Sequence, residues 1–132
     1  MGAVTPPKPR VLIVDDQPEV LRVYARALEV DGLEAQTADS AQAAMDLISA
    51  APPDAILLDL KMPYVNGLGF LYRLRESYPR IPVAIITGLP SVDAQTTQEI
   101  RELEAELAFK PMTIAEVQSV ARRLIARNPP QA

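Results

Sequence analysis

The chain lacks both cysteine and histidine among its 132 residues. Without cysteine it forms no disulfide and offers no thiolate nucleophile, so its composition allows a cytoplasmic location. Without histidine it excludes Ser-His-Asp triads, histidine general bases and the common zinc sites. No apolar run approaches the roughly 18–20 residues of a membrane span, and the N-terminus lacks a signal-peptide core. We therefore expect no membrane insertion.

The residues that are present are those of a compact globular domain. Hydrophobic residues make up 48% of the chain and charged residues 23%, which argues against general disorder. The length suits one domain with a sizeable core. A net charge of −4 disfavours direct binding to nucleic acid, which usually requires a basic surface. We expect a proline-rich flexible leader at residues 1–9, a folded domain at 10–128 and a short tail at 129–132.

Short apolar runs alternate with helical patterns along the chain. The expected strands, each followed by a helix, are 11–14, 33–37, 55–58, 82–86 and 105–109. The helices begin at Pro18, after Ser40 or Asp39 as the cap, after Gly67, near Ser91 and after Thr113. The spacing from Thr113 to Glu116 predicts a capping box. The last helix has an apolar stripe of Ile114, Val117, Val120, Leu124 and Ile125. This alternation predicts an α/β fold, a doubly wound five-stranded parallel sheet with helices on both faces.

Polar side chains stand where four of these strands end. Asp15 and Asp16 follow the first strand, Asp59 the third, Thr87 the fourth and Lys110 the fifth. Because parallel strands end at one edge of a sheet, these residues should converge in one crevice. Three carboxylates together repel one another, and Mg²⁺ relieves that repulsion with an all-oxygen site. With a nucleophilic carboxylate, an ammonium and a hydroxyl, the crevice suits phosphoryl transfer onto Asp59.

The order of these residues resembles the receiver domains of bacterial two-component response regulators. The resemblance rests on Asp15-Asp16, Asp59 within DLKMPYVNG, Thr87 within IITG and Lys110 within FKP. It implies a flavodoxin-like strand order 2-1-3-4-5. It also implies a cytoplasmic phosphoacceptor that, at most, catalyses its own phosphorylation and dephosphorylation. Its partners would be a sensor histidine kinase or a histidine phosphotransfer protein, and its output the face of the fourth helix, fifth strand and fifth helix.

The resemblance also assigns roles within the site. Asp59 would accept the phosphoryl group, and Thr87 and Lys110 would bind its oxygens. Mg²⁺ would be held by Asp16, Asp59 and the backbone carbonyl of Lys61, with Asp15 acting mostly through water. The Lys110-Pro111 peptide is often cis in such domains.

One position departs from the family pattern. Receivers usually carry Tyr or Phe three residues before the lysine, where this chain has Leu107. Phe109 falls on the same strand face but not at the matching position. Lys61 and Leu89 occupy the two positions that tune access of water to the acyl phosphate in the family, either slowing hydrolysis or having no effect.

Two other functions compete with the receiver hypothesis. A degenerate receiver, acting as a phosphorylation-independent interaction module, is favoured by Leu107. A metal-dependent phosphatase of the haloacid-dehalogenase type would need an acid two residues after its nucleophile, where Lys61 stands. The arginines at 122, 123 and 127 fit either a small basic patch or cations at a helix end. The kinase, the output partner, the oligomeric state and the choice between a stand-alone receiver and part of a longer regulator stay open.

Overall fold

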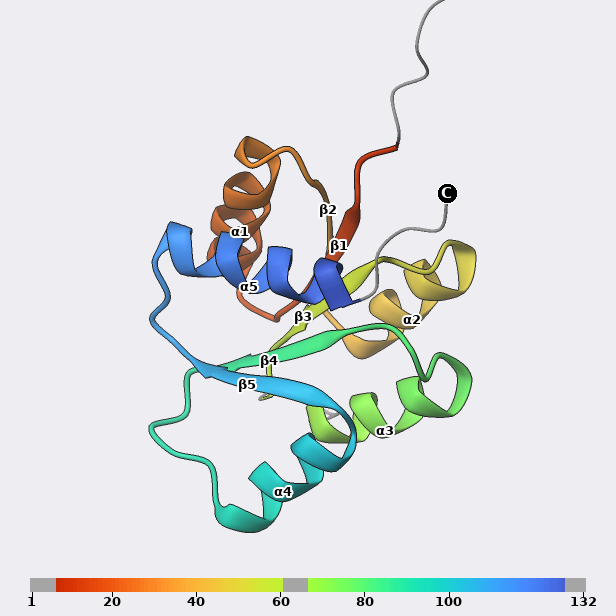
Figure 1. Ribbon diagram of the computed structural model, residues 1–132, viewed down its shortest axis with the longest axis vertical. Coiled ribbons are helices and arrows are strands. Elements are labelled where there is room, and N and C mark those ends of the chain that lie inside the picture. The colour runs from red at the N-terminus through yellow and green to blue at the C-terminus, as the bar shows by residue number, and fades with distance from the viewer. Residues whose placement is uncertain (1–6, 61–66, 128–132) are drawn as a thin grey trace, which may run out of the picture.

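The computed structural model describes residues 7–60 and 67–127. Five strands and five helices alternate along this part of the chain (Figure 1). In order they are β1 Arg10–Val14, α1 Pro18–Val30, β2 Glu34–Ala38, α2 Ala41–Ala50, β3 Ala55–Leu58, α3 Gly67–Ser77, β4 Val83–Thr87, α4 Ala94–Glu102, β5 Ala105–Phe109 and α5 Ile114–Arg127. Residues 1–6, Lys61 and the expected tail at 129–132 lie outside the described residues. No described helix is long and apolar enough to cross a membrane.

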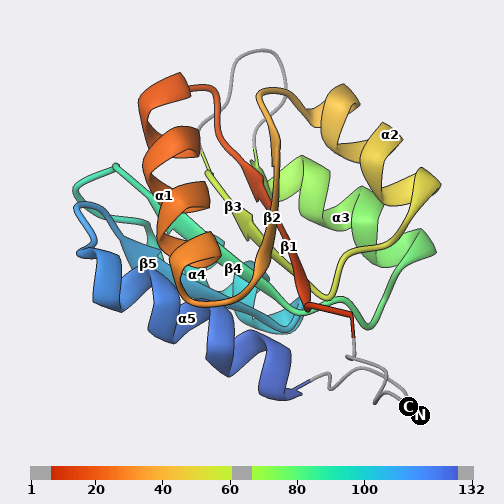
Figure 2. The same cartoon turned by 90° about the horizontal axis from the view of Figure 1, so that it is seen from above.

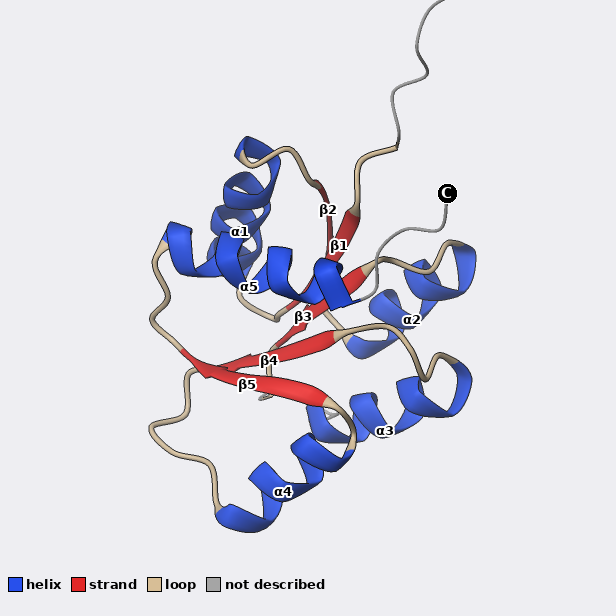
Figure 3. Ribbon diagram, in the orientation of Figure 1, coloured by secondary structure: helices blue, strands red, loops and turns tan. Residues whose placement is uncertain are grey.

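All strand pairs of the sheet are parallel, and the strand order is β2-β1-β3-β4-β5. This confirms the predicted doubly wound fold and its strand order. In Figure 2, α1 and α5 lie on one side of the sheet, and α2 and α3 lie on the other. Figure 3 shows the strands as a central layer between helices. After β2 the chain crosses over β1, so β3 pairs with the other side of β1.

The core consists of two apolar layers because alternate strand residues point to opposite faces. On β1, Leu12 and Val14 join the layer under α2 and α3, whereas Val11 and Ile13 join the layer under α1 and α5. The central strands β1, β3 and β4 are buried along nearly their whole length. Their continuous apolar runs, rather than alternating ones, follow from this burial on both faces.

The helix starts follow the local sequence. Pro18 stands in the first turn of α1, and Ser40 caps α2 by accepting a hydrogen bond from the Ala43 N–H. The Thr113 hydroxyl accepts from the Glu116 N–H and the Glu116 carboxylate accepts from the Thr113 N–H. The predicted capping box is confirmed. The expectation that Ile114 faces the core is wrong, since this first residue of α5 is 57% exposed.

Helix α4 begins later than expected, after its N-cap Asp93, and has few anchors. Ile100 is its only buried residue. Two polar contacts reach it from α3: the Arg75 Nε donates to the Leu103 carbonyl at 2.8 Å, and the phenol of Tyr72 is hydrogen-bonded to Glu99. Partial desolvation and Glu99 together raise the pKa of Tyr72. The packing of α4 therefore depends mainly on one side chain.

Two isoleucines at helical positions test this dependence. Ile100→Ala should lower the free energy of unfolding by roughly 2–5 kcal/mol, because it leaves a cavity beneath α4. Ile114→Ala should change it by less than about 0.5 kcal/mol, since that side chain is already exposed. Urea denaturation measures both values, and hydrogen exchange should show protection lost first in α4 of the Ile100 variant. Equal effects of the two substitutions would contradict this account of α4.

Candidate phosphoryl-transfer site

The carboxyl edge of the sheet brings three acidic side chains together. The backbone N–H groups of Asp15 and Asp59 continue the sheet by donating to Ala38 and Val14, which places both residues directly at strand ends. One carboxylate oxygen from each of Asp15, Asp16 and Asp59 lies within 4.8 Å of the others. Asp15 and Asp59 are buried, whereas Asp16 is exposed. The structure confirms the prediction that these three acidic side chains lie close together.

Lys110 supplies the positive charge of the cluster. Its Nζ donates to Asp15 Oδ2 at 2.7 Å and lies 3.7 Å from Asp59 Oδ2. Burial alone would lower the pKa of Lys110, but the hydrogen bond to Asp15 and the charge of Asp59 raise it overall. A raised pKa contributes stability at every pH below the ordinary lysine value near ~10.4 and loses it only above that range. Lys110 is therefore protonated under physiological conditions.

Thr87 lies at the end of β4 between Asp59 and Lys110 in the strand order. It is fully buried, and its hydroxyl accepts a hydrogen bond from the Leu89 N–H at 3.1 Å. Its backbone carbonyl accepts from the Lys110 N–H at 2.7 Å, so the two residues are held in register. The hydroxyl proton stays available to donate to an added oxygen. The Lys110-Pro111 peptide is cis, as the family resemblance implies.

The acidic cluster fits a hard divalent cation. All three side chains offer carboxylate oxygen, the ligand that Mg²⁺ prefers, and the exposed Asp16 leaves room for water ligands. The backbone carbonyl of Lys61, the fourth predicted ligand, lies outside the described residues. Asp15 also accepts the Gln17 N–H at 2.9 Å through Oδ1, which fixes its carboxylate while Oδ2 faces Lys110.

Sequence reasoning missed the involvement of two residues near the site. The phenol of Tyr24, on α1, lies close enough to interact with the charges of Lys110, Asp15 and Asp59. Burial is the main cause that raises its pKa. Gly67, which the sequence places just before the third helix, is the first residue of α3. A Cβ added there would lie 2.5 Å from the Asp59 carbonyl oxygen and 2.8 Å from the Leu60 Cα.

Leu107 is partly buried and packs into the core layer under α2 and α3, and no aromatic ring takes its place on that strand. Phe109 is 45% exposed and does not fill the position.

The arginines of α5 form neither a free basic patch nor simple helix-end cations. Arg122 pairs with Asp31, while Arg123 and Arg127 share Glu106.

The comparisons with known proteins agree with this geometry. The model of the response regulator receiver domain matches residues 11–122. The chain is 34% identical over 123 residues to the transcriptional regulatory protein PrrA of Mycobacterium tuberculosis, covering 91% of this chain and 51% of PrrA. The chain thus spans about half the length of that relative.

Solved structures match at the level of the fold. The receiver domain of the Francisella response regulator 1452 superimposes with a TM-score of 0.81 at 27% identity, covering 91% of this chain and 98% of that one. Vibrio cholerae CheY4 gives the same TM-score at 24% identity, covering 89% and 98%. The chain belongs to the response regulator receiver domain family. It is a signalling module of two-component systems whose members use a phosphoacceptor aspartate and Mg²⁺.

Two glycines at the site provide a matched steric test. Gly67→Ala should lower the free energy of unfolding by about 1–3 kcal/mol, because its Cβ would collide with backbone atoms that cannot swing away. Gly88→Ala should have little effect, since the nearest atom to its Cβ would be Lys110 Cδ at 3.7 Å. Chemical denaturation of both variants compares the two. A Gly67 variant as stable as wild type would disprove the close approach of α3 to the Asp59 backbone.

Proposed function

We propose that Asp59 accepts a phosphoryl group from the phosphohistidine of a sensor histidine kinase or a histidine phosphotransfer protein. The observation that carries the proposal is the position of Lys110 Nζ, which faces both Asp15 and Asp59 inside one acidic cluster. An isolated acid at a strand end would not account for a largely buried lysine that contacts two carboxylates. Together these groups can offset the negative charge that a transferred phosphoryl group brings.

The chemistry follows from the groups that meet at the carboxyl edge of the sheet. A carboxylate oxygen of Asp59 attacks phosphorus in line, the new O–P bond forms, and the N–P bond to the imidazole of the donor breaks. Asp15, Asp16 and Asp59 would hold Mg²⁺, which when bound supplies charge neutralisation at the phosphoryl oxygens. Lys110 neutralises a further oxygen, and the Thr87 hydroxyl donates a hydrogen bond to another. No residue of this chain needs to act as a general base.

Phosphorylation would then act on α4 and its neighbours. The modification adds about 1.5–2 negative charges and new acceptor oxygens. When the phosphoryl oxygens bind Thr87 and Lys110, the loops that follow β4 and β5 move. Helix α4 resists this movement least, because Ile100 is its only buried residue. We propose that the surface of α4, β5 and α5 thereby changes its affinity for a downstream protein. The cytoplasmic location stays a prediction from the family resemblance.

Chemical phosphorylation tests the acceptor. With a small phosphodonor and Mg²⁺, the intact mass of wild type should rise by one phosphoryl group, whereas Asp59→Asn should stay unlabelled because its amide is a poor nucleophile. Asp46→Asn, an exposed acid on α2, serves as the matched control and should be labelled like wild type. Full labelling of the Asp59 variant would refute the assignment.

A degenerate receiver is the second candidate, and Leu107 is the observation that favours it. Without an aromatic ring at position 107 of β5, no side chain there can follow Thr87 as the ring does in the usual switch. Such a module would engage its partner with or without phosphate. The two candidates differ in what they require of the acidic cluster, since only a working acceptor needs a functional metal site.

Thermal unfolding with and without Mg²⁺ separates the two candidates. A ligand that binds only the native state stabilises it by about 2.7 kcal/mol at one hundred times its Kd. The working receiver should therefore gain a higher Tm with Mg²⁺, and Asp16→Asn should lose that gain. The same variant should be more stable than wild type without metal, because one of three clustered charges is gone. A wild-type Tm that does not change when Mg²⁺ is added would favour the degenerate module.

A further inference from the structure

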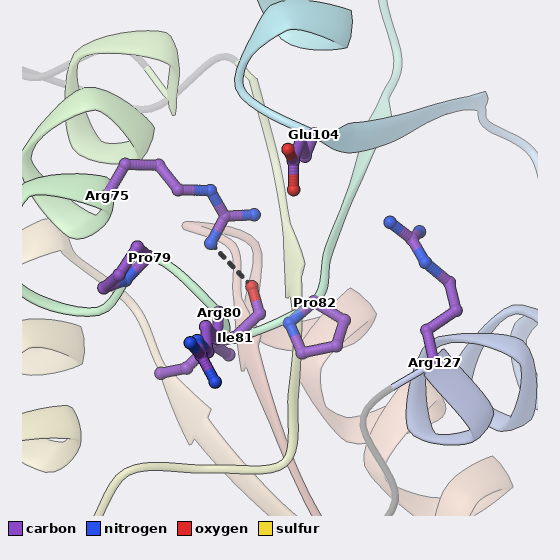
Figure 4. Close-up of a pocket in the computed structure, with 7 residues that line it drawn as sticks. All are labelled: Arg75, Pro79, Arg80, Ile81, Pro82, Glu104 and Arg127. Carbon is purple, nitrogen blue, oxygen red and sulfur yellow. Dashed lines mark hydrogen bonds between the residues drawn. The ribbon is translucent and has the colours of Figure 1, made fainter.

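A second charged cluster lies at the edge of the sheet opposite the aspartates. A cleft of about 320 Å³ is lined by residues from the end of α3, the α3–β4 loop, the turn before β5 and the end of α5. Figure 4 shows the guanidinium of Arg75 and that of Arg127 pointing into it from two sides, with the carboxylate of Glu104 above. The five-residue strand β4 separates it from Thr87, a span of roughly 16 Å.

Arg75 is held firmly and still has free donors. Its Nε donates to the Leu103 carbonyl, and its Nη1 donates to the carbonyls of Ile81 at 2.7 Å and Tyr78 at 3.4 Å. Figure 4 draws the hydrogen bond from Arg75 to the Ile81 carbonyl as a dashed line. Within the described residues, Nη2 has no hydrogen-bond partner. A guanidinium fixed by three carbonyls is preorganised to present its remaining N–H groups.

Positive charge exceeds negative charge around the cleft. Arg127 uses only Nη1 for its contact with Glu106, which it shares with Arg123. The guanidinium of Arg80 makes no hydrogen bond or ion pair with any described residue. Three arginines, Arg75, Arg80 and Arg127, and one carboxylate, Glu104, line the cleft, in a chain whose net charge is −4. The residual charge of about +2 matches that of a phosphate dianion.

The two inward arginines also repel each other. Burial lowers the pKa of Arg75, and the charge of Arg127 lowers it further while Glu104 acts in the opposite direction. Glu104 has φ of 57°, a left-handed conformation that favours glycine at the end of a helix. Its exposed carboxylate makes no hydrogen bond to a described side chain, but its charge acts on the pKa of Arg75 more strongly than the charge of Arg127 does.

We propose that this cleft binds a phosphate dianion between the free guanidinium nitrogens of Arg75 and Arg127, with Arg80 at its rim. Two guanidinium groups can donate charge-assisted hydrogen bonds to phosphate oxygens, because the planar guanidinium presents its N–H groups in a geometry that matches them. Because Arg75 also holds the Leu103 carbonyl at the end of α4, occupancy would stiffen that helix end. The site is independent of Asp59 and of the proposed phosphoryl transfer.

NMR titration of the full chain with inorganic phosphate tests the proposal. The measurement is made without Mg²⁺ and at constant ionic strength set with chloride. The amide signals of Ile81, Glu104 and Arg127 should shift and saturate with a Kd on the order of 1 mM. The double variant with Arg80→Gln and Arg127→Gln should bind about tenfold more weakly. Arg75 is not substituted, because its loss would remove the hydrogen bond to the Leu103 carbonyl that links α3 to the end of α4.

Two further variants sharpen the result. Glu104→Gln should bind phosphate more tightly than wild type, because it removes a repelling carboxylate. Arg26→Gln, an exposed arginine on α1, should leave the Kd unchanged. A parallel titration with methyl phosphate distinguishes an organic phosphomonoester from the inorganic ion by which of the two binds more tightly. No saturable shift at the cleft, shifts confined to Thr87 and Lys110, or an undiminished response in the double variant would each overturn the proposal.

Discussion

The ammonium of Lys110 lies between the carboxylates of Asp15 and Asp59, and the carboxyl edge of the sheet is organised around that contact. Two buried carboxylates so close together repel each other, and the ammonium offsets that repulsion. Lys110 reaches them because β5 runs parallel to β1 and β3, so that residues nearly a hundred positions apart end at one edge. The same parallel arrangement brings Thr87 beside the lysine. The site is therefore a consequence of strand direction.

The two helical layers differ in how firmly they hold the sheet. Helices α1 and α5 are tied to each other by polar contacts as well as apolar packing: Gln118 donates to the Ala27 carbonyl, and Arg122 pairs with Asp31. On the other face, α4 depends on Ile100 and on contacts from α3. A rearrangement at the carboxyl edge meets little resistance from α4 and much from the α1–α5 pair. A change at the carboxyl edge should therefore displace α4 more readily than it displaces α1 or α5.

Much of this structure could be predicted from the sequence, for identifiable reasons. Continuous apolar runs predict buried parallel strands, and the alternation of strands and helices predicts the layers. Together these patterns predict that Asp59 and Lys110 lie at one edge of the sheet, where the structure has them. The Thr113–Glu116 capping box is local, and local patterns predict well. Ile114 was assigned wrongly because helical spacing cannot tell where the apolar layer ends. The pairing of α5 arginines with Asp31 and Glu106 depends on tertiary distances that spacing does not contain. The arginine cleft was missed for the same reason, since its members come from unrelated segments.

The placement of the tyrosines has a practical consequence. The chain contains no tryptophan, so its intrinsic ultraviolet emission comes from tyrosine alone. The phenol of Tyr24 interacts with the charges of Asp15 and Asp59, and that of Tyr72 interacts with Glu99 on α4, so one phenol senses the acceptor and another the least anchored helix. Quenching of each depends on its distance from a neighbouring carboxylate. Replacing one ring at a time with phenylalanine would turn the unlabelled protein into an optical reporter of either place.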